Sequence, residues 1–188
     1  TAWILGYKDN PFDVRYGGWL LMNCDEAVPY DTILNQGHGL HVALIGISGY
    51  VMNMVLFFLS LFFLPRMFVM RSLYLLASFY WLCVLNLMAL FGYVPLNAFS
   101  HYGDIGWFVR GLDISPWPTF IAGSLLVMAG IYRIFRVEIV RVYAFAPLCS
   151  LFARKSLLAL SLFFLFLFLY TRGYNPFTDA GANPMNKI

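Results

Sequence analysis

The sequence predicts an all-α integral membrane protein with about four transmembrane helices. The chain of 188 residues is 61% hydrophobic and only 11% charged, and its mean hydropathy is +0.74. Roughly a quarter of the residues are charged in a soluble domain, where they cover the water-facing surface. The chain also contains four long apolar segments, each close to the length of about 20 residues that crosses the hydrocarbon core of a bilayer.

These apolar segments divide the chain into three parts. Residues 1–38 are expected to form an extramembrane N-terminal segment, residues 39–171 a transmembrane helical bundle, and residues 172–188 a polar C-terminal tail. Within the bundle, the helices are expected at about residues 39–64, 72–93, 117–135 and 154–171.

Proline and charge patterns mark the ends of the helices. Pro65 follows the first segment, and Pro116 and Pro118 open the third, which suits the start of a helix. Residues 137–152 alternate Arg, Glu and apolar side chains, which indicates a helix that continues into the membrane interface or a short amphipathic connection.

The basic residues predict the orientation of the bundle. Cytoplasmic loops of membrane proteins carry an excess of Lys and Arg, so the Arg-rich loops are expected in the cytoplasm. The ends of the chain and the loop with His101 and Asp104 are then expected on the opposite side, where most acidic residues lie. The basic residues at the ends that join helices one to two and three to four are Arg66, Arg71, Arg133, Arg136, Arg141, Arg154 and Lys155.

Small residues suggest which helices lie in the interior of the bundle. They let two helix backbones approach closely in a membrane. The first helix has three of them at three-residue steps, and the third has two pairs seven residues apart, so these two helices are expected inside. The fourth consists almost entirely of Phe and Leu, as expected of a lipid-facing span. The small residues are Ala43, Gly46 and Gly49, then Ala122, Gly123, Ala129 and Gly130.

Three histidines and one carboxylate form a candidate metal site. His38, His41, His101 and Asp104 are all predicted on one side of the membrane, and such side chains bind zinc or another divalent cation. The spacing of these residues is generic. The alternative interpretation is that His38 and His41 lie at the membrane interface, cap a helix and contact lipid headgroups.

Two amides and one thiol lie within the predicted spans. Asn53 and Asn86 are expected to face the bundle, because a buried amide in lipid needs a hydrogen-bond partner. Each forms either a hydrogen bond between helices or a contact that positions a substrate. Cys83 is expected to be a small buried residue.

Three segments resemble the M50 (site-2 protease-like) family of membrane metallopeptidases. The stretch TAWILGYKDNPFDVRYGGWLL resembles the segment after the zinc-binding helix of that family. Ser48, Gly49 and Asn53 match its second conserved helix, with Tyr50 where Pro is usual. The segment LNLMALFGYVPLNAFSHYGDIGW resembles the region that supplies the third zinc ligand, with a longer spacing and Ile105 in place of Gly. Its matching residues are Asn86, Pro95 and Asp104.

The resemblance implies a zinc-dependent intramembrane peptidase, but the chain contains no His-Glu-x-x-His motif. That motif supplies two zinc ligands and the Glu that activates water. On this alignment it would precede Thr1, so the resemblance implies that residues 1–188 contain no catalytic residue and are incomplete or inactive. The resemblance makes Asp104 the third zinc ligand and assigns Asn53 and Asn86 to substrate positioning.

The alternative prediction is a non-catalytic accessory or structural subunit of a larger membrane complex. The many aromatic residues (19 Phe, 12 Tyr and 5 Trp) suit extensive contact with lipid or protein. The expected partners are therefore the lipid bilayer and other membrane subunits, and nothing in the sequence indicates nucleic-acid binding.

Overall fold

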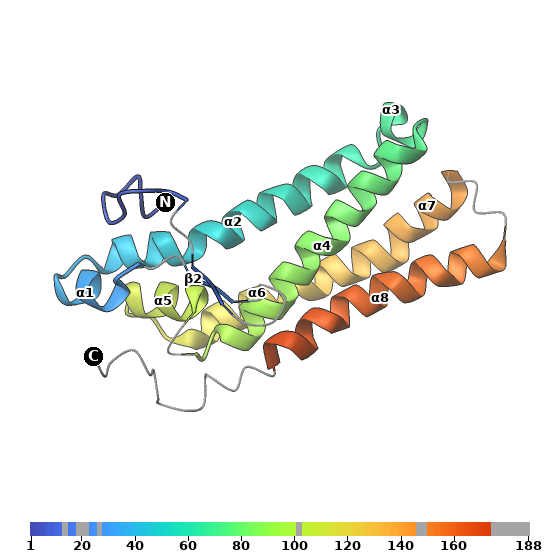
Figure 1. The fold of residues 1–188 in the computed structure, drawn as a ribbon. Helices are drawn as coiled ribbons and strands as arrows, with labels where there is room; N and C mark the ends of the chain where they lie inside the picture. The colour runs from blue at the N-terminus through green and yellow to red at the C-terminus, as the bar shows by residue number, and fades with distance from the viewer. Residues whose placement is uncertain (13–14, 18–22, 26–27, 101–102, 146–149, 174–188) are drawn as a thin grey trace.

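The computed structural model describes residues 1–12, 15–17, 23–25, 28–100, 103–145 and 150–173. Long helices run side by side along an elongated bundle (Figure 1). Within these described ranges, three helical segments are long and apolar enough to cross a membrane: Gly39–Phe63, Leu73–Phe91 and Pro116–Phe145. The prediction of a helical membrane protein is confirmed at this level.

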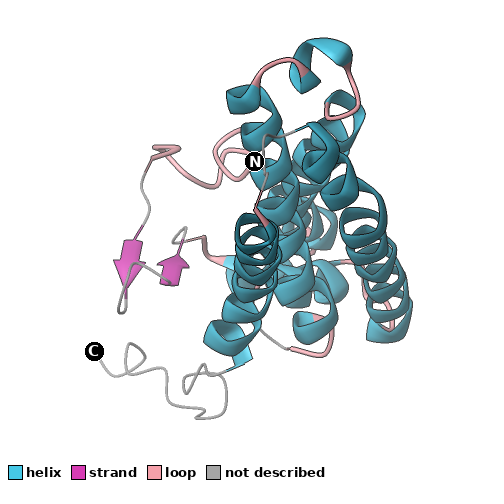
Figure 2. Cartoon of the chain, turned by 90° about the vertical axis from the view of Figure 1, so that its right-hand side faces the viewer, coloured by secondary structure: helices cyan, strands magenta, loops and turns pink. Residues whose placement is uncertain are grey.

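The N-terminal segment contains two short strands and a short helix. Strands β1 (Arg15–Gly17) and β2 (Asn23–Asp25) pair antiparallel, and this ribbon lies outside the helix bundle (Figure 2). Helix α1 (Tyr30–Asn35) follows and leads directly into the first long helix.

The first two long helices form a hairpin. Helix α2 (Gly39–Phe63) is followed by the single turn α3 (Met67–Met70) and by α4 (Leu73–Asn97). The Ser72 hydroxyl caps α4 by accepting a hydrogen bond from the amide of Leu75 at 3.5 Å. Helix α4 ends four residues later than predicted, with Pro95 inside it.

The second half of the chain contains one short helix and two long ones. Helix α5 (Asp104–Gly111) precedes α6 (Pro116–Arg133), which continues through the π-helical turn η2 (Ile134–Glu138) into α7 (Ile139–Phe145). The predicted third helix therefore extends ten residues beyond its expected end. Helix α8 (Leu151–Gly173) occupies the position of the fourth predicted helix.

Helix α4 is the centre of the bundle and packs against α2, α6 and α8. Cys83 and Leu87 on α4 are fully buried, which confirms the prediction for Cys83. The prediction that the first and third helices form the interior is wrong. The glycines of α6 instead bring that helix onto α4, because Gly123 faces Val94 and Gly130 faces Leu87.

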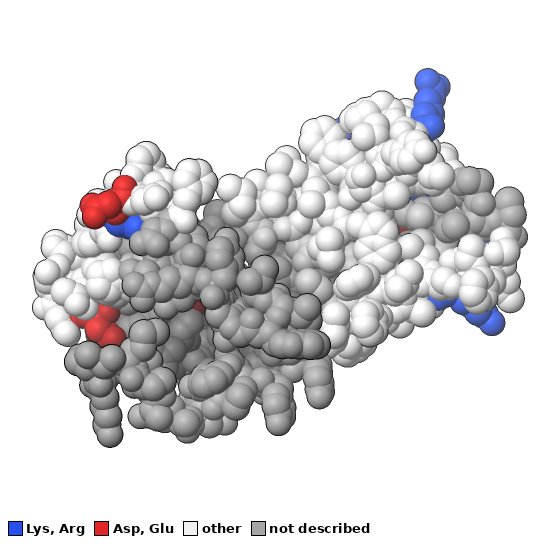
Figure 3. Space-filling view, in the orientation of Figure 1, with Lys and Arg blue, Asp and Glu red and all other residues white. Residues whose placement is uncertain are grey.

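A second, smaller core lies at the end of the bundle where α1 and α5 meet α2. The rings of Tyr30 and Trp107 stack there with centroids 4.9 Å apart, and Ile33 of α1 is almost fully buried beside them. Acidic side chains gather at this end and basic ones mainly at the other (Figure 3). We call these the acidic end and the basic end.

Candidate functional site

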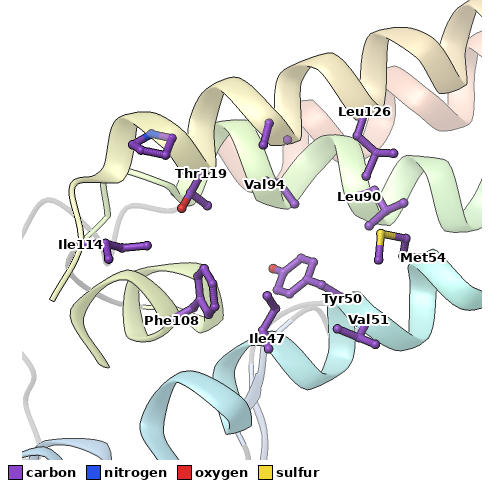
Figure 4. Close-up of a pocket in the computed structure, with 13 residues that line it drawn as sticks. Ile47, Tyr50, Val51, Met54, Leu90, Val94, Phe108, Ile114, Thr119 and Leu126 are labelled. Carbon is purple, nitrogen blue, oxygen red and sulfur yellow. The ribbon is translucent and has the colours of Figure 1, made fainter. Parts of the chain in front are cut away.

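An apolar cavity of about 390 Å³ lies between α2, α4, α5 and α6, toward the acidic end. Tyr50 of α2, Val94 of α4 and Phe108 of α5 converge on it from three sides (Figure 4). The fourth side is α6, from Pro118 to Leu126. The volume of the cavity lies within the range of about 300–1,000 Å³ that is usual for small-molecule sites.

The way the helices pack explains this cavity. Gly39 and Gly46 of α2 lie directly against the backbone of α5, at Gly111 and Asp104 respectively. On the other flank, Gly123 draws α6 onto α4. Helices α2 and α6 are therefore each held by a different neighbour, and the space between them is lined by side chains of medium size.

The lining of the cavity suits an apolar ligand. Of the described residues that line it, Tyr50 and Thr119 carry hydroxyl groups and all others are apolar. The Tyr50 side chain extends into the space between the helices (Figure 4). This lining offers two weakly polar contacts and no charged group.

The surroundings of the cavity are apolar and exposed. Val51 and Ile114 line the cavity and are 42% and 39% exposed. Ile121 and Leu125 lie beside it on α6 and are more than half exposed. These residues belong to or adjoin segments that are long and apolar enough to cross a membrane.

The residues predicted to bind a metal are only partly brought together. The His38 and His41 rings stack with centroids 5.3 Å apart, and the Tyr7 hydroxyl lies 2.7 Å from Nδ1 of His41. The backbone of Asp104 contacts α2 at Gly46. His41 and Gly46 are five residues apart, so they point about 140° away from each other around α2.

His101 lies outside the described residues. Within the described ranges, no three His, Cys, Asp or Glu side chains lie close enough to hold a metal ion together. His38 and His41 thus face the N-terminal segment, whereas Asp104 lies at the seam between α2 and α5.

The two predicted substrate-positioning amides lie near the cavity but do not line it. Asn86 is buried and donates a hydrogen bond from Nδ2 to the Leu82 carbonyl, 2.7 Å away in its own helix. Asn53 is half-buried on α2, one turn after Tyr50. For Asn86, the structure shows a bond within a helix where one between helices was predicted.

Glu138 is a polar residue that the sequence did not single out. It is fully buried, although it lies in a helix that can cross a membrane. The Arg133 Nε donates to its carboxylate at 2.9 Å, and Arg141 forms a second ion pair with it. The sequence signal for it is a single acid within an Arg-rich segment, a pattern that is also typical of a membrane interface.

Comparisons with known proteins do not assign this chain to a family. Comparison with protein-family models, with characterised proteins and with solved structures gives no significant match to this chain.

Proposed function

We propose that this protein is a multi-pass membrane protein that binds the apolar chain of a lipid in the cavity between α2, α4, α5 and α6. In this proposal α8 is a fourth span, the basic end is cytoplasmic, and the cavity lies in the opposite half of the bilayer. The protein then acts as a non-catalytic lipid-binding subunit. The cavity itself is the observation that carries the proposal.

The position of the cavity favours a lipid chain as its occupant. It runs along α6 from Pro118 to Leu126, and Trp117 marks the start of that helix. Trp side chains are enriched at the level of the headgroups, and eight residues of helix cover about 12 Å along the axis. The cavity therefore extends from just below the interface toward the middle of the bilayer, as an acyl chain does.

The exposed apolar surroundings support the same occupant. A space next to hydrocarbon and lined almost entirely by apolar groups offers ordered water few polar partners. An acyl chain gains dispersion contacts with the cavity walls, whereas a charged or strongly polar ligand would lose its hydration without compensation.

The test is photocrosslinking with a phosphatidylcholine that carries a diazirine in its acyl chain, using the full chain in nanodiscs. Ala122 lines the cavity, so Ala122→Phe should fill it. We expect crosslinking to α2 and α6 to fall about tenfold, as a loss of about 1.4 kcal/mol in binding predicts. The matched control is Ala129→Phe, since Ala129 is also an exposed alanine, two turns further along α6.

Mass spectrometry of the crosslinked peptides gives the readout. Labels on the cavity-lining segments that disappear in Ala122→Phe and persist in Ala129→Phe would support the proposal. Equal labelling of both variants, or labels spread evenly along the lipid-facing helices, would reject it.

A second candidate function is the zinc-dependent intramembrane peptidase implied by the M50 resemblance. The contact of Asp104 with α2 favours it, because the predicted third ligand lies beside the helix that matches the second conserved helix of that family. Metal content of the longest gene product, measured by mass spectrometry with Asp104→Ala as control, tests this candidate. One zinc per chain that is lost in the variant would support it, and no zinc in either protein would exclude it.

A further inference from the structure

The buried carboxylate of Glu138 fixes two arginines at the basic end of the bundle. Its side chain is 0% exposed, whereas the side chains of Arg133 and Arg141 are 46% and 22% exposed. Each arginine bonds a different oxygen of the same carboxylate. Both guanidinium groups are therefore held next to each other and partly at the surface.

The π-helical turn η2 makes this arrangement possible. Arg133 and Glu138 are five residues apart, which in an α-helix places them about 140° apart around the axis. A π-helical turn is closed by bonds between residues i and i+5, so it brings these two residues onto one side. Such turns are rare and frequently found at functional sites.

The two arginines have hydrogen-bond donors left for another ligand. A guanidinium group has five N–H donors in a planar fork, and each ion pair with Glu138 shown above uses one of them. Two guanidinium groups and one carboxylate sum to one positive charge. That charge matches the single negative charge of a phosphodiester, which arginine binds with bidentate geometry.

The length of the helix puts these residues at the level of lipid headgroups. Pro116–Phe145 comprises 30 residues, or about 45 Å of helix, and the hydrocarbon core is only about 30 Å thick. With Trp117 at one interface, about 20 residues reach the other boundary. That boundary falls near Val137, between the two arginines.

We propose that Arg133 and Arg141, positioned by Glu138, bind the phosphate group of an anionic phospholipid at the basic end of the protein. This site is separate from the apolar cavity, which lies toward the acidic end. Glu138 does not touch the lipid: it is a positioning residue that orients both guanidinium groups.

The experiment measures lipid retention by native mass spectrometry. The full chain is reconstituted in phosphatidylcholine nanodiscs with a minor fraction of phosphatidylglycerol and is then released into detergent. We expect wild type to retain phosphatidylglycerol, and Arg133→Gln and Arg141→Gln each to retain about tenfold less, in line with the loss of one charge-assisted hydrogen bond. Arg71→Gln, which removes an exposed arginine at the same end, is the control and should retain the lipid.

The Glu138→Gln variant distinguishes binding by positioned arginines from general electrostatic attraction of the anionic lipid. It raises the local positive charge by one, so general electrostatic attraction predicts more retention, whereas loss of positioning predicts less. If this variant does not fold, as judged by circular dichroism and gel filtration, the lipid retention of Arg133→Gln and Arg141→Gln tests the proposal. Each of them leaves the other arginine on Glu138.

The outcomes are distinct. Retention that depends on Arg133 and Arg141 but not on Arg71, and that falls in Glu138→Gln, supports the proposal. Equal retention by all variants, an equal loss in Arg71→Gln, or higher retention in Glu138→Gln overturns it. Arginine-dependent binding of inorganic phosphate in pure phosphatidylcholine nanodiscs, without retention of phosphatidylglycerol, would overturn the lipid as the ligand.

Discussion

The two ends of the bundle are held together in different ways. At the acidic end, α2 and α5 touch through glycine backbone at Gly39, Gly46 and Gly111. At the basic end, the Tyr80 hydroxyl bonds Ser161 across α4 and α8 at 2.8 Å, and Glu138 bonds two arginines of its own continuous helix. The first kind of contact leaves a cavity beside it, whereas the second places a few paired polar groups within an otherwise apolar interior.

This difference reflects what each kind of contact requires. Close backbone packing needs small residues, and where they stop the helices diverge around larger side chains. A buried polar group instead needs a partner in a defined position, because an unpaired one costs free energy in a low-dielectric interior. The acidic end is therefore suited to bind an apolar ligand, and the basic end to hold charged side chains in fixed positions.

The largest effect should come from removing both arginines at the basic end. The double variant Arg133→Gln with Arg141→Gln leaves the Glu138 carboxylate buried without an ionic partner. We expect it to lower the free energy of unfolding by about 3–5 kcal/mol, the range for an uncompensated buried charge. Thermal unfolding in detergent gives the measurement.

Adding Glu138→Gln to that double variant removes the buried, unpaired negative charge and should restore most of the free energy of unfolding. A double variant as stable as wild type would show that the carboxylate is not buried. It would then be wrong that buried polar pairs stabilise the basic end.

An intermediate effect should come from the glycine seam at the acidic end. A Cβ atom on Gly46 would collide with the Asp104 carbonyl oxygen and lie 3.2 Å from the Phe108 amide nitrogen. Because the obstacle is backbone, we expect Gly46→Ala to cost about 1–3 kcal/mol, measured as a lowered unfolding temperature.

Gly49→Ala is the matched control on the same helix, since no described atom lies within 4 Å of its added Cβ. It should be neutral or slightly stabilising, because Ala is about 1 kcal/mol more favourable than Gly inside a helix. Equal destabilisation by both changes would contradict the close contact between α2 and α5.

The smallest effect should come from the bond that joins α4 and α8. Tyr80→Phe removes one hydroxyl and keeps the ring, and we expect a loss of about 0.6 kcal/mol, the average for hydrogen bonds between helices in a membrane. A double-mutant cycle with Ser161→Ala measures the coupling between them. A coupling energy near zero would show that this bond does not hold α8 in place.

Much of the fold could be predicted from the sequence because apolar length alone reports where helices can cross a bilayer. The starts of α2 and α4 were predicted to within one residue. The central role of α4 was not predicted, because small residues indicate that a helix is approached closely but not which helix approaches it. Gly123 and Gly130 meet α4, and Gly46 meets α5.

The candidate sites were harder to predict. The cavity depends on how far α2 and α6 are held apart, which no single segment determines. Glu138 and Arg141 have the i,i+3 spacing of an ordinary helix. The pairing of Arg133 with Glu138 at i,i+5 does not fit 3.6 residues per turn, and it follows only from the π-helical turn. Asp104 was singled out by motif, and the structure adds its contact with α2 without completing a three-ligand group among the described residues.

The position of α4 also has a consequence for how the protein is made. Helices α2 and α4 are joined by a single turn, so they can enter the membrane together as a hairpin before the long helices that follow them. The later long helices, α6 and α8, both dock on α4. Helix α8 is synthesised after α6 and completes the packing around α4. Once the residues up to Phe145 have left the ribosome, the cavity should therefore already be formed, whereas the packing of the basic end should finish only when α8 docks.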